Sequence, residues 1–275
     1  MEKALEKLCV HTITTKPWQL EEAVSHYEAS GIKGISVWED SIKDLGAEKS
    51  GNLIRDHGLE IISYVRGGFF PHHQTLERQK AIDKNKKLIE EAAALGAPSL
   101  VLVCGAEPSQ ELEVSRKQTQ EGIEALLPLA ISLDVKLSIE PLHPMYADTR
   151  SAINTLKQAN NLAEAINSPH VGIAVDVYHL WWDNDLENQI KRCGENNNLF
   201  AFHICDWSVP TSDMLLDRGL MGEGCIPLSK IKRWIDSTGF TGYHEVEIFS
   251  NKFWAMDQKI FLQKIIDAYK NYTKS

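Results

Sequence analysis

The chain has 275 residues, of which 43% are hydrophobic and 24% charged, and its formal net charge at pH 7 is −9. These values suit one large globular domain over residues 1–275, and the acidic charge, with no basic stripe, argues against nucleic acid as a partner. Residues 1–10 are too charged for a secretory signal, and no apolar run approaches the roughly 18 residues of a membrane span, so we expect a cytoplasmic protein outside the membrane.

The cysteines are scattered along the chain and make no CxxC pair. We expect buried, reduced thiols and a reducing compartment, because three of the five lie in or beside predicted strands. The five are Cys9, Cys104, Cys193, Cys205 and Cys225.

Strand signals and helix signals alternate from one end of the chain to the other. The predicted strands cover residues 8–14, 34–40, 60–70, 99–105, 136–140, 171–176, 199–203 and 242–250. The predicted helices cover residues 17–31, 42–57, 72–95, 110–133, 148–166, 185–193, 227–239 and 261–272. Strands separated by helices in this order predict βαβ units and a parallel sheet.

Eight such units close most naturally as an α/β protein of the (β/α)8 TIM barrel type. The alternative is an open, doubly wound sheet. It is disfavoured because no GxGxxG follows the first strand, and because ligand-type residues end four strands where an open sheet would concentrate its site at one switch point. The irregular stretch from Ser208 to Ile226 follows the seventh strand, so we expect it to lie over the mouth of the barrel.

Three predicted strands end in side chains that can ligate a metal, Glu140, Asp176 and His203, and the eighth predicted strand supplies Glu247. Alternation along the first three of these strands puts small residues on the ligand's face, namely Ser138, Gly172, Ala174 and Ala201. The opposite face carries bulky residues, namely Leu137, Ile139, Ile173, Val175, Phe200 and Phe202. We expect the face with small residues to point into a closed barrel and the face with bulky residues to pack against the helices.

Three carboxylates and one imidazole at one rim suit a single divalent cation, because they would repel one another without one. The imidazole favours Mn²⁺, with Mg²⁺, Co²⁺ and Zn²⁺ as alternatives. For any one of these residues, a hydrogen-bonded polar side chain at a strand end is the ordinary explanation. Glu245 shares a face with Glu247 but lies deeper, where we expect it to pair with Lys136.

Other polar and aromatic side chains are expected near the mouth, where they could contact hydroxyls and C–H faces of a small sugar. Trp38 follows the second strand, and His143 follows the fifth. Arg66 is either a clamp for a carboxylate or phosphate or an ordinary surface arginine. Trp181 and Trp182 either line the site or only cap the barrel. Glu223 in the segment RGLMGEG repels phosphate, which favours an unphosphorylated substrate.

Five segments of the chain together resemble the xylose isomerase-like TIM barrel superfamily: SIEPLHP, VDVYHLWW, FHICDW, RGLMGEGCIPL and GYHEVEIFS. The resemblance implies that Glu140, Asp176, His203 and Glu247 bind one divalent metal and that the two glutamates serve as acid and base. It also implies that His179, three residues after Asp176, and Arg218 contact substrate oxygens.

Two departures from that superfamily matter. The chain has no D-x-H between Asp206 and Glu245, a feature that its trinuclear zinc nucleases need. It also lacks the second glutamate that ketose epimerases carry shortly after the residue matched by Glu140, since PLHPMYADTR has no carboxylate before Asp148. We therefore expect the far end of the substrate to be held differently.

The residues and the resemblance predict a metal-dependent isomerase or epimerase of a small ketose, inosose or related keto-sugar, working by proton transfer through a metal-chelated enediolate. The alternative is a lyase or dehydratase acting on a keto-sugar or 3-keto-glycoside, because the same site supports elimination. A sugar-binding barrel without activity is a further alternative, disfavoured by the paired glutamates. The expected partner is a small carbohydrate, and the sequence leaves a homo-oligomer open.

Overall fold

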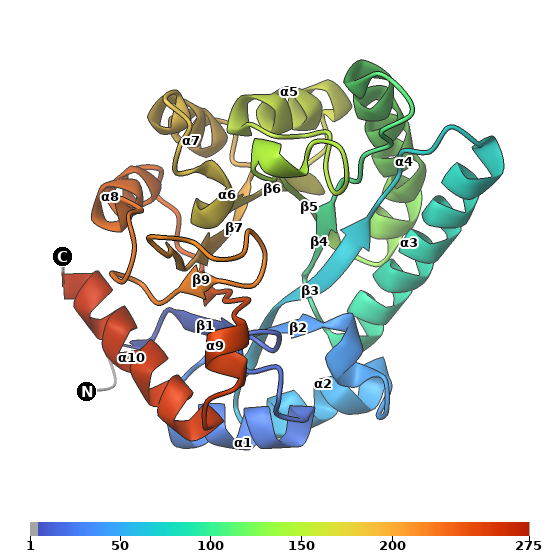
Figure 1. The fold of residues 1–275 in the computed structure, drawn as a ribbon. Coiled ribbons are helices and arrows are strands. Elements are labelled where there is room, and N and C mark those ends of the chain that lie inside the picture. The colour runs from blue at the N-terminus through green and yellow to red at the C-terminus, as the bar shows by residue number, and fades with distance from the viewer. Residues whose placement is uncertain (1–4, 275) are drawn as a thin grey trace.

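The computed structural model describes residues 5–274, in which eight parallel strands form a closed barrel. Figure 1 shows the ring of strands with the helices around it. The predicted (β/α)8 fold is confirmed. The barrel strands are β1 (Leu8–His11), β2 (Gly34–Trp38), β3 (Glu60–Gly68), β4 (Ser99–Val103), β5 (Lys136–Glu140), β6 (Val171–Asp176), β7 (Leu199–Ile204) and β10 (His244–Val246). Around the ring they follow the order β1-β10-β7-β6-β5-β4-β3-β2, so β10 and β1 close the barrel.

Long helices surround the ring of strands in Figure 1. They are α1 (Leu20–Ala29), α2 (Ala47–Asp56), α3 (Thr75–Leu95), α4 (Leu112–Ser132), α5 (Leu156–Ile166), α7 (Leu186–Glu195), α8 (Leu228–Ser237) and α10 (Gln258–Lys274). Short helical turns follow four of the strands: η2 (Glu39–Ile42), η3 (Pro144–Tyr146), α6 (Val177–Leu180) and α9 (Asn251–Trp254). Within residues 5–274, none of the helices has the length and apolar character needed to cross a membrane.

The helix predicted from Asp148 begins eight residues later, at Leu156. Thr155 ends the preceding loop by a capping box, in which its hydroxyl accepts from Gln158 N and the Gln158 side chain accepts from Thr155 N. The residues before it form a loop that returns to the end of β4, where Gly105 N donates to Arg150 O at 2.8 Å. Part of the predicted helix is therefore a loop at the mouth of the barrel.

The two faces of the strands divide largely as their side-chain sizes predict. Val65, Val101, Ala174 and Ala201 form a small apolar cluster, separate from the main core, with Trp38 packed against it. The bulky residues of the opposite face, among them Ile139, belong to the main core that the helices cover. The small residues on the inner face thus leave room inside the barrel for polar side chains.

Phe200 is an exception, and its predicted face is wrong. The β6–β7 register shifts so that Ile173 pairs with Leu199 and Ala174 with Ala201, which leaves Phe200 as an extra residue. Its ring lies over Gly172, where a side-chain Cβ would come within 2.4 Å of it. Lys136 Nζ lies 4.8 Å from the same ring, so Lys136 contacts an aromatic ring and not Glu245.

The segment after β7 lies over the mouth, as expected from the sequence. It contains a two-stranded antiparallel sheet of β8 (Asp206–Trp207) and β9 (Arg218–Gly219). The Met214 carbonyl accepts hydrogen bonds from the hydroxyls of Tyr146, at 2.7 Å, and Tyr178, at 2.8 Å. These bonds tie the segment to the loops that follow β5 and β6.

The end of β3 carries an irregularity that points one side chain toward the mouth. The β3–β4 register shifts between Val65 and Gly67, so Arg66 is an extra residue of a β-bulge. The Asn85 amide fixes the next turn, because it accepts from Gly68 N at 2.6 Å and donates to Gly68 O at 2.8 Å. Gly68 has φ +105°, and a Cβ there would lie 1.9 Å from Val103 O.

Gly68→Ala should lower the free energy of unfolding by about 3 kcal/mol or more, because the backbone of β4 cannot move away without breaking its pairing. The matched control is Gly31→Ala, since Gly31 also has positive φ but no neighbour within 4 Å of its Cβ position. It should cost only about 1 kcal/mol. Denaturant unfolding measures both, and equal losses for the two variants would contradict the close approach at Gly68.

Candidate active site and metal centre

The four predicted ligand residues meet at one end of the barrel interior. Glu140 ends β5, Asp176 ends β6, His203 lies in β7, and Glu247 directly follows β10. All four are buried, and one ligand atom from each lies within 4.8 Å of the others. His203 Nδ1 is 2.8 Å from Glu140 Oε1. The carboxyl ends of parallel strands share one rim, and this geometry brings the four side chains together.

Arg218 joins two of these carboxylates from the segment above the mouth. Its Nη1 donates to Asp176 Oδ2 at 2.9 Å and to Glu247 Oε2 at 2.8 Å. The guanidinium also lies 4.4 Å from the ring centre of Tyr178, and the side chain is only 3% exposed. Arg218 therefore supplies a fixed positive charge inside the cluster of carboxylates.

His179 lies on the other side of Arg218. Its Nε2 is 3.2 Å from Arg218 Nη2, and because a guanidinium can only donate, Nε2 accepts and the proton of a neutral ring sits on Nδ1. Burial and the charge of Arg218 lower the pKa of His179 well below its usual range, so the ring is neutral. The buried Nδ1 has no hydrogen-bond partner among the described residues, which leaves one N–H donor available.

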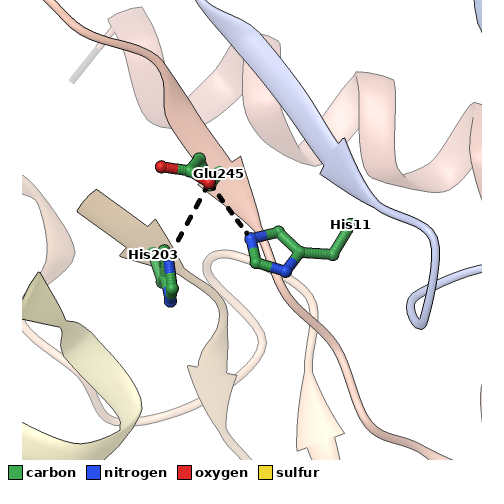
Figure 2. Close-up of side chains that lie close together, drawn as sticks. All are labelled: His11, His203 and Glu245. Atoms are coloured by element: carbon green, nitrogen blue, oxygen red, sulfur yellow. Dashed lines mark ion pairs between the residues drawn. The ribbon is translucent and has the colours of Figure 1, made fainter. Parts of the chain in front are cut away.

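A second group of polar side chains adjoins the ligand residues, and Figure 2 shows Glu245 lying between His11 and His203. Glu245 Oε2 is 3.3 Å from His11 Nε2 and 3.7 Å from His203 Nε2, and it accepts from Ser36 Oγ at 2.6 Å. The expectation that Glu245 lies deeper than Glu247 is met, but the expected pairing with Lys136 is wrong. His11 was not predicted, because the strand predicted over residues 8–14 runs past it, whereas β1 ends at His11.

Burial opposes ionisation of both carboxylates that Arg218 contacts, but the pKa values of the two shift in opposite directions. For Glu247, the charges of Arg218 and His11 outweigh burial and hold the pKa well below its usual range. His11 Nδ1 lies 3.3 Å from Glu247 Oε1. For Asp176, burial dominates and raises the pKa to about 6 despite Arg218. Glu247 is therefore an ionised carboxylate at neutral pH even without a metal.

The donor set of the cluster fits a divalent cation. Glu140, Asp176 and Glu247 each offer an oxygen and His203 a nitrogen, a combination typical of Mn²⁺, Zn²⁺ or Co²⁺ sites. Ligands on opposite sides of such an ion lie about 4.2 Å apart at metal–ligand distances of about 2.1 Å. A separation of up to 4.8 Å thus needs only a small contraction.

A separate group of potential ligands lies outside the barrel: His72, His73 and Glu107. His73 Nδ1 is 3.1 Å from Glu107 Oε2, and His73 is exposed. His72 Nδ1 accepts a hydrogen bond from Gln74 N, which places the proton of the neutral ring on the nitrogen that faces Glu107. This group suits a surface hydrogen-bond network better than a metal.

A narrow cavity of about 20 Å³ lies above the ligand residues. Of the residues predicted near the site, Glu140, Glu247, His179, Arg218, Arg66 and Trp38 line it. Sequence reasoning missed several other lining residues, among them Arg150, Tyr146 and Phe249. Arg150 lies in the segment predicted as helix, and no pattern in the sequence set it apart.

His143 does not line this cavity, although it was expected to contact the substrate. Its ring packs against Trp182 and Trp207, with centres 5.5 and 5.4 Å away, and its Nδ1 accepts from Met145 N. Trp182 Nε1 donates to His179 O at 2.8 Å, and Trp181 packs on Trp207. These side chains support the loop beside the cavity.

The chain belongs to the xylose isomerase-like TIM barrel family, whose model matches residues 24–265. It is similar to the inosose isomerase of Bacillus velezensis, with 23% identity over 98% of this chain and 96% of that protein. The resemblance inferred from the five segments of the sequence is confirmed. With isomerases of this kind among its relatives, the chain is an enzyme of the isomerase and epimerase class.

Two solved structures share the fold over almost the whole chain. Protein SMc04130 from Sinorhizobium meliloti 1021 is 44% identical, with a TM-score of 0.94 over 97% of this chain and 98% of that one. The IOLI protein with a bound zinc atom is 21% identical, with a TM-score of 0.82 over 97% of this chain and 96% of that one.

The metal-free protein should lose stability as the pH rises from about 6.5. Burial lowers the pKa of His203, but Glu245 and Glu140 more than reverse this and raise it from 6.5 to about 10. A folded-state pKa raised above the unfolded value gives stability that is complete below pH 6.5 and is lost toward pH 10.

Urea unfolding at pH 6 to 8.5, with a chelator present, measures this slope. His203→Gln should flatten it, whereas His57→Gln, at a partly exposed histidine outside the barrel interior, should not. An unchanged slope in His203→Gln would show that His203 stays neutral among the carboxylates.

Proposed function

We propose that this protein is a divalent-metal-dependent isomerase or epimerase of a small ketose, inosose or related keto-sugar. The main supporting observation is that two glutamates, Glu140 and Glu247, reach the same cluster of ligand atoms from well-separated strands, below a cavity at the mouth of the barrel. The inosose isomerase relatives support the substrate class, and the zinc in the IOLI protein supports the metal.

In this proposal Glu140, Asp176, His203 and Glu247 hold one divalent cation, for which Mn²⁺ is our first choice and Mg²⁺, Co²⁺ and Zn²⁺ are alternatives. When bound, such a cation draws electron density from two neighbouring oxygens of a hydroxyketone and makes the adjacent C–H more acidic. Arg218 supplies the remaining positive charge, because it already contacts Asp176 and Glu247.

Glu247 is the stronger candidate for the base that removes the proton. The charges of Arg218 and His11 hold the pKa of its carboxyl well below the usual range, and Arg218 Nη1 fixes its orientation by donating to Oε2 at 2.8 Å. Glu140 is three strands away around the ring, since β7 and β6 lie between β10 and β5. A sugar bound between the two glutamates could lose a proton to one and regain it from the other on the opposite face.

His179 and Arg218 position the substrate oxygens in this proposal. The unpartnered Nδ1–H of His179 can donate to a hydroxyl or carbonyl oxygen, and the buried Nε of Arg218 is likewise without an acceptor among residues 5–274. Trp38 and Phe249 pack edge to face with ring centres 5.2 Å apart and give the cavity an apolar wall for the C–H face of a sugar.

The proposal also places the enzyme in the cytoplasm as a single domain whose partner is a small carbohydrate. It requires neither nucleic acid nor a membrane, and it is compatible with a homo-oligomer.

Asp176→Asn should weaken binding of Mn²⁺ or Zn²⁺ by about 100-fold or more and abolish turnover, because a charged ligand oxygen becomes a neutral amide. Competition with a fluorescent chelator measures the affinity without any assay of activity. Asp44→Asn, at an exposed position, is the matched control and should bind metal as the wild type does. A metal-replete, active Asp176→Asn protein would remove Asp176 from the proposed site.

Glu140→Gln and Glu247→Gln should differ in proton exchange. With Mn²⁺ in D₂O and a panel of ketoses, inososes and 3-keto-glycosides, the wild type should incorporate deuterium next to the carbonyl, as NMR can follow. Glu247→Gln should lose exchange by about 10²-fold or more, the usual contribution of a general base. Glu140→Gln should retain exchange but not complete the epimerisation.

Metal occupancy is measured alongside, because both changes remove a ligand charge, and Glu48→Gln serves as an exposed control. Release of water from the substrate, in place of an epimer or isomer, would favour the lyase alternative. Wild-type exchange rates in both metal-loaded variants would contradict the acid and base roles.

A further inference from the structure

Two arginines at the cavity have no acidic partner. Arg66 and Arg150 both line the space above Glu140 and Glu247. Among residues 5–274, neither guanidinium takes part in a hydrogen bond or an ion pair with another side chain. Aromatic rings hold them instead: the Arg66 guanidinium lies 5.0 Å from the ring centre of Phe69 and 5.7 Å from that of Trp38. Arg150 lies 5.5 Å from the ring centre of Tyr146.

Both arginines start from fixed backbone. Arg66 is the extra residue of the β3 bulge, and the Asn85 amide holds the turn directly after it. Arg150 is bound at both backbone groups: its N donates to Tyr146 O at 2.9 Å, and its carbonyl accepts from Gly105 N at 2.8 Å. These side chains are therefore built into the mouth of the barrel and are not ordinary surface arginines.

The two positive charges affect each other. Burial, and next the charge of Arg150, lower the pKa of Arg66, whereas the charges of Glu140, Glu247 and Asp40 raise it, and both guanidinium groups are only partly exposed. Partly desolvated like charges that face one cavity destabilise the fold unless an anion joins them. The aromatic contacts restrict the side chains but do not neutralise them.

Once a cation is bound, the carboxylates below the cavity no longer balance the positive charges of Arg66 and Arg150. Glu140, Asp176, Glu245 and Glu247 carry four negative charges, and a dication with Arg218 offsets three of them. Arg66 and Arg150 then leave one positive charge in excess, before any histidine is counted. That excess lies at the end of the cavity where the far end of a substrate would sit.

We propose that Arg66 and Arg150 form a clamp for an oxyanion at the far end of the substrate, so that the substrate is a keto-sugar carrying a carboxylate or phosphate. A guanidinium presents paired N–H donors that match the oxygens of either group. This inference rests on the proposed function for the rest of the substrate, but the clamp is a property of the two arginines alone.

Matched ligands test the clamp directly. Binding of D-fructose, D-fructuronate and D-fructose 6-phosphate to Mn²⁺-loaded protein is measured by calorimetry, with the tagatose and psicose sets in parallel. In at least one set the carboxylated member should bind about tenfold or more tighter than the neutral one, as expected for charge-assisted hydrogen bonds. If the phosphate has this advantage and the carboxylate does not, the clamp holds and its ligand is a phosphate.

Arg66→Gln and Arg150→Gln should each bring the ratio of charged to neutral affinity close to one. Arg233→Gln, at an exposed position on α8, is the matched control and should keep the wild-type ratio. Equal affinities for neutral and charged members in the wild type would overturn the clamp. So would an advantage that survives in both pocket variants.

A simple dianion separates this inference from the proposed reaction. Malonate, at a concentration that leaves Mn²⁺ bound, should raise the melting temperature of Mn²⁺-loaded wild-type protein more than chloride at equal ionic strength, and the Arg66→Gln, Arg150→Gln double variant should lose this protection. A melting temperature raised by malonate, without deuterium exchange on any keto-sugar, would reject the proposed reaction and support the clamp. Deuterium exchange on neutral keto-sugars, with no effect of malonate on the melting temperature, would support the proposed reaction and reject the clamp.

Discussion

Four carboxylates inside one end of a barrel, with a single buried guanidinium among them, are the electrostatic constraint on which the rest of this structure depends. Of these four carboxylates, Arg218 forms ion pairs with Asp176 and Glu247, whereas Glu140 and Glu245 contact neighbouring imidazoles and hydroxyls. Buried charges of one sign repel strongly where water cannot screen them. Such a cluster suits a cation, and the neighbouring imidazoles and hydroxyls contact the carboxylates in its absence.

Two buried histidines, His203 and His11, lie between the carboxylates of the cluster. His203 lies between Glu140 and Glu245, and His11 between Glu245 and Glu247, so each imidazole separates a pair of carboxylates. Their rings meet edge to face with centres 4.7 Å apart. Metal-binding histidines commonly have a carboxylate on their second nitrogen, and Glu245 occupies that place for His203.

The order of the strands, and the meeting of four polar side chains at one rim, could be predicted from the sequence because both follow from local periodicity. Strands whose small residues share a face with Glu140, Asp176 or His203 can be recognised without knowing which strands lie beside them. What could not be predicted depends on contacts between distant segments. The bulges that move Arg66 and Phe200 arise from register between strands, and the side-chain direction of Arg150 comes from a loop bound to Gly105. His143 was misplaced for the same reason, since its orientation is decided by Trp182 and Trp207.

The most direct test of a cation among the buried carboxylates is a crystal structure of the protein grown with Mn²⁺, with anomalous differences recorded near the manganese edge. The account predicts one strong peak, about 2.1–2.3 Å from oxygens of Glu140, Asp176 and Glu247 and from His203 Nδ1. No peak in the barrel at full manganese loading, or a peak only at the surface group of His72, His73 and Glu107, would contradict it.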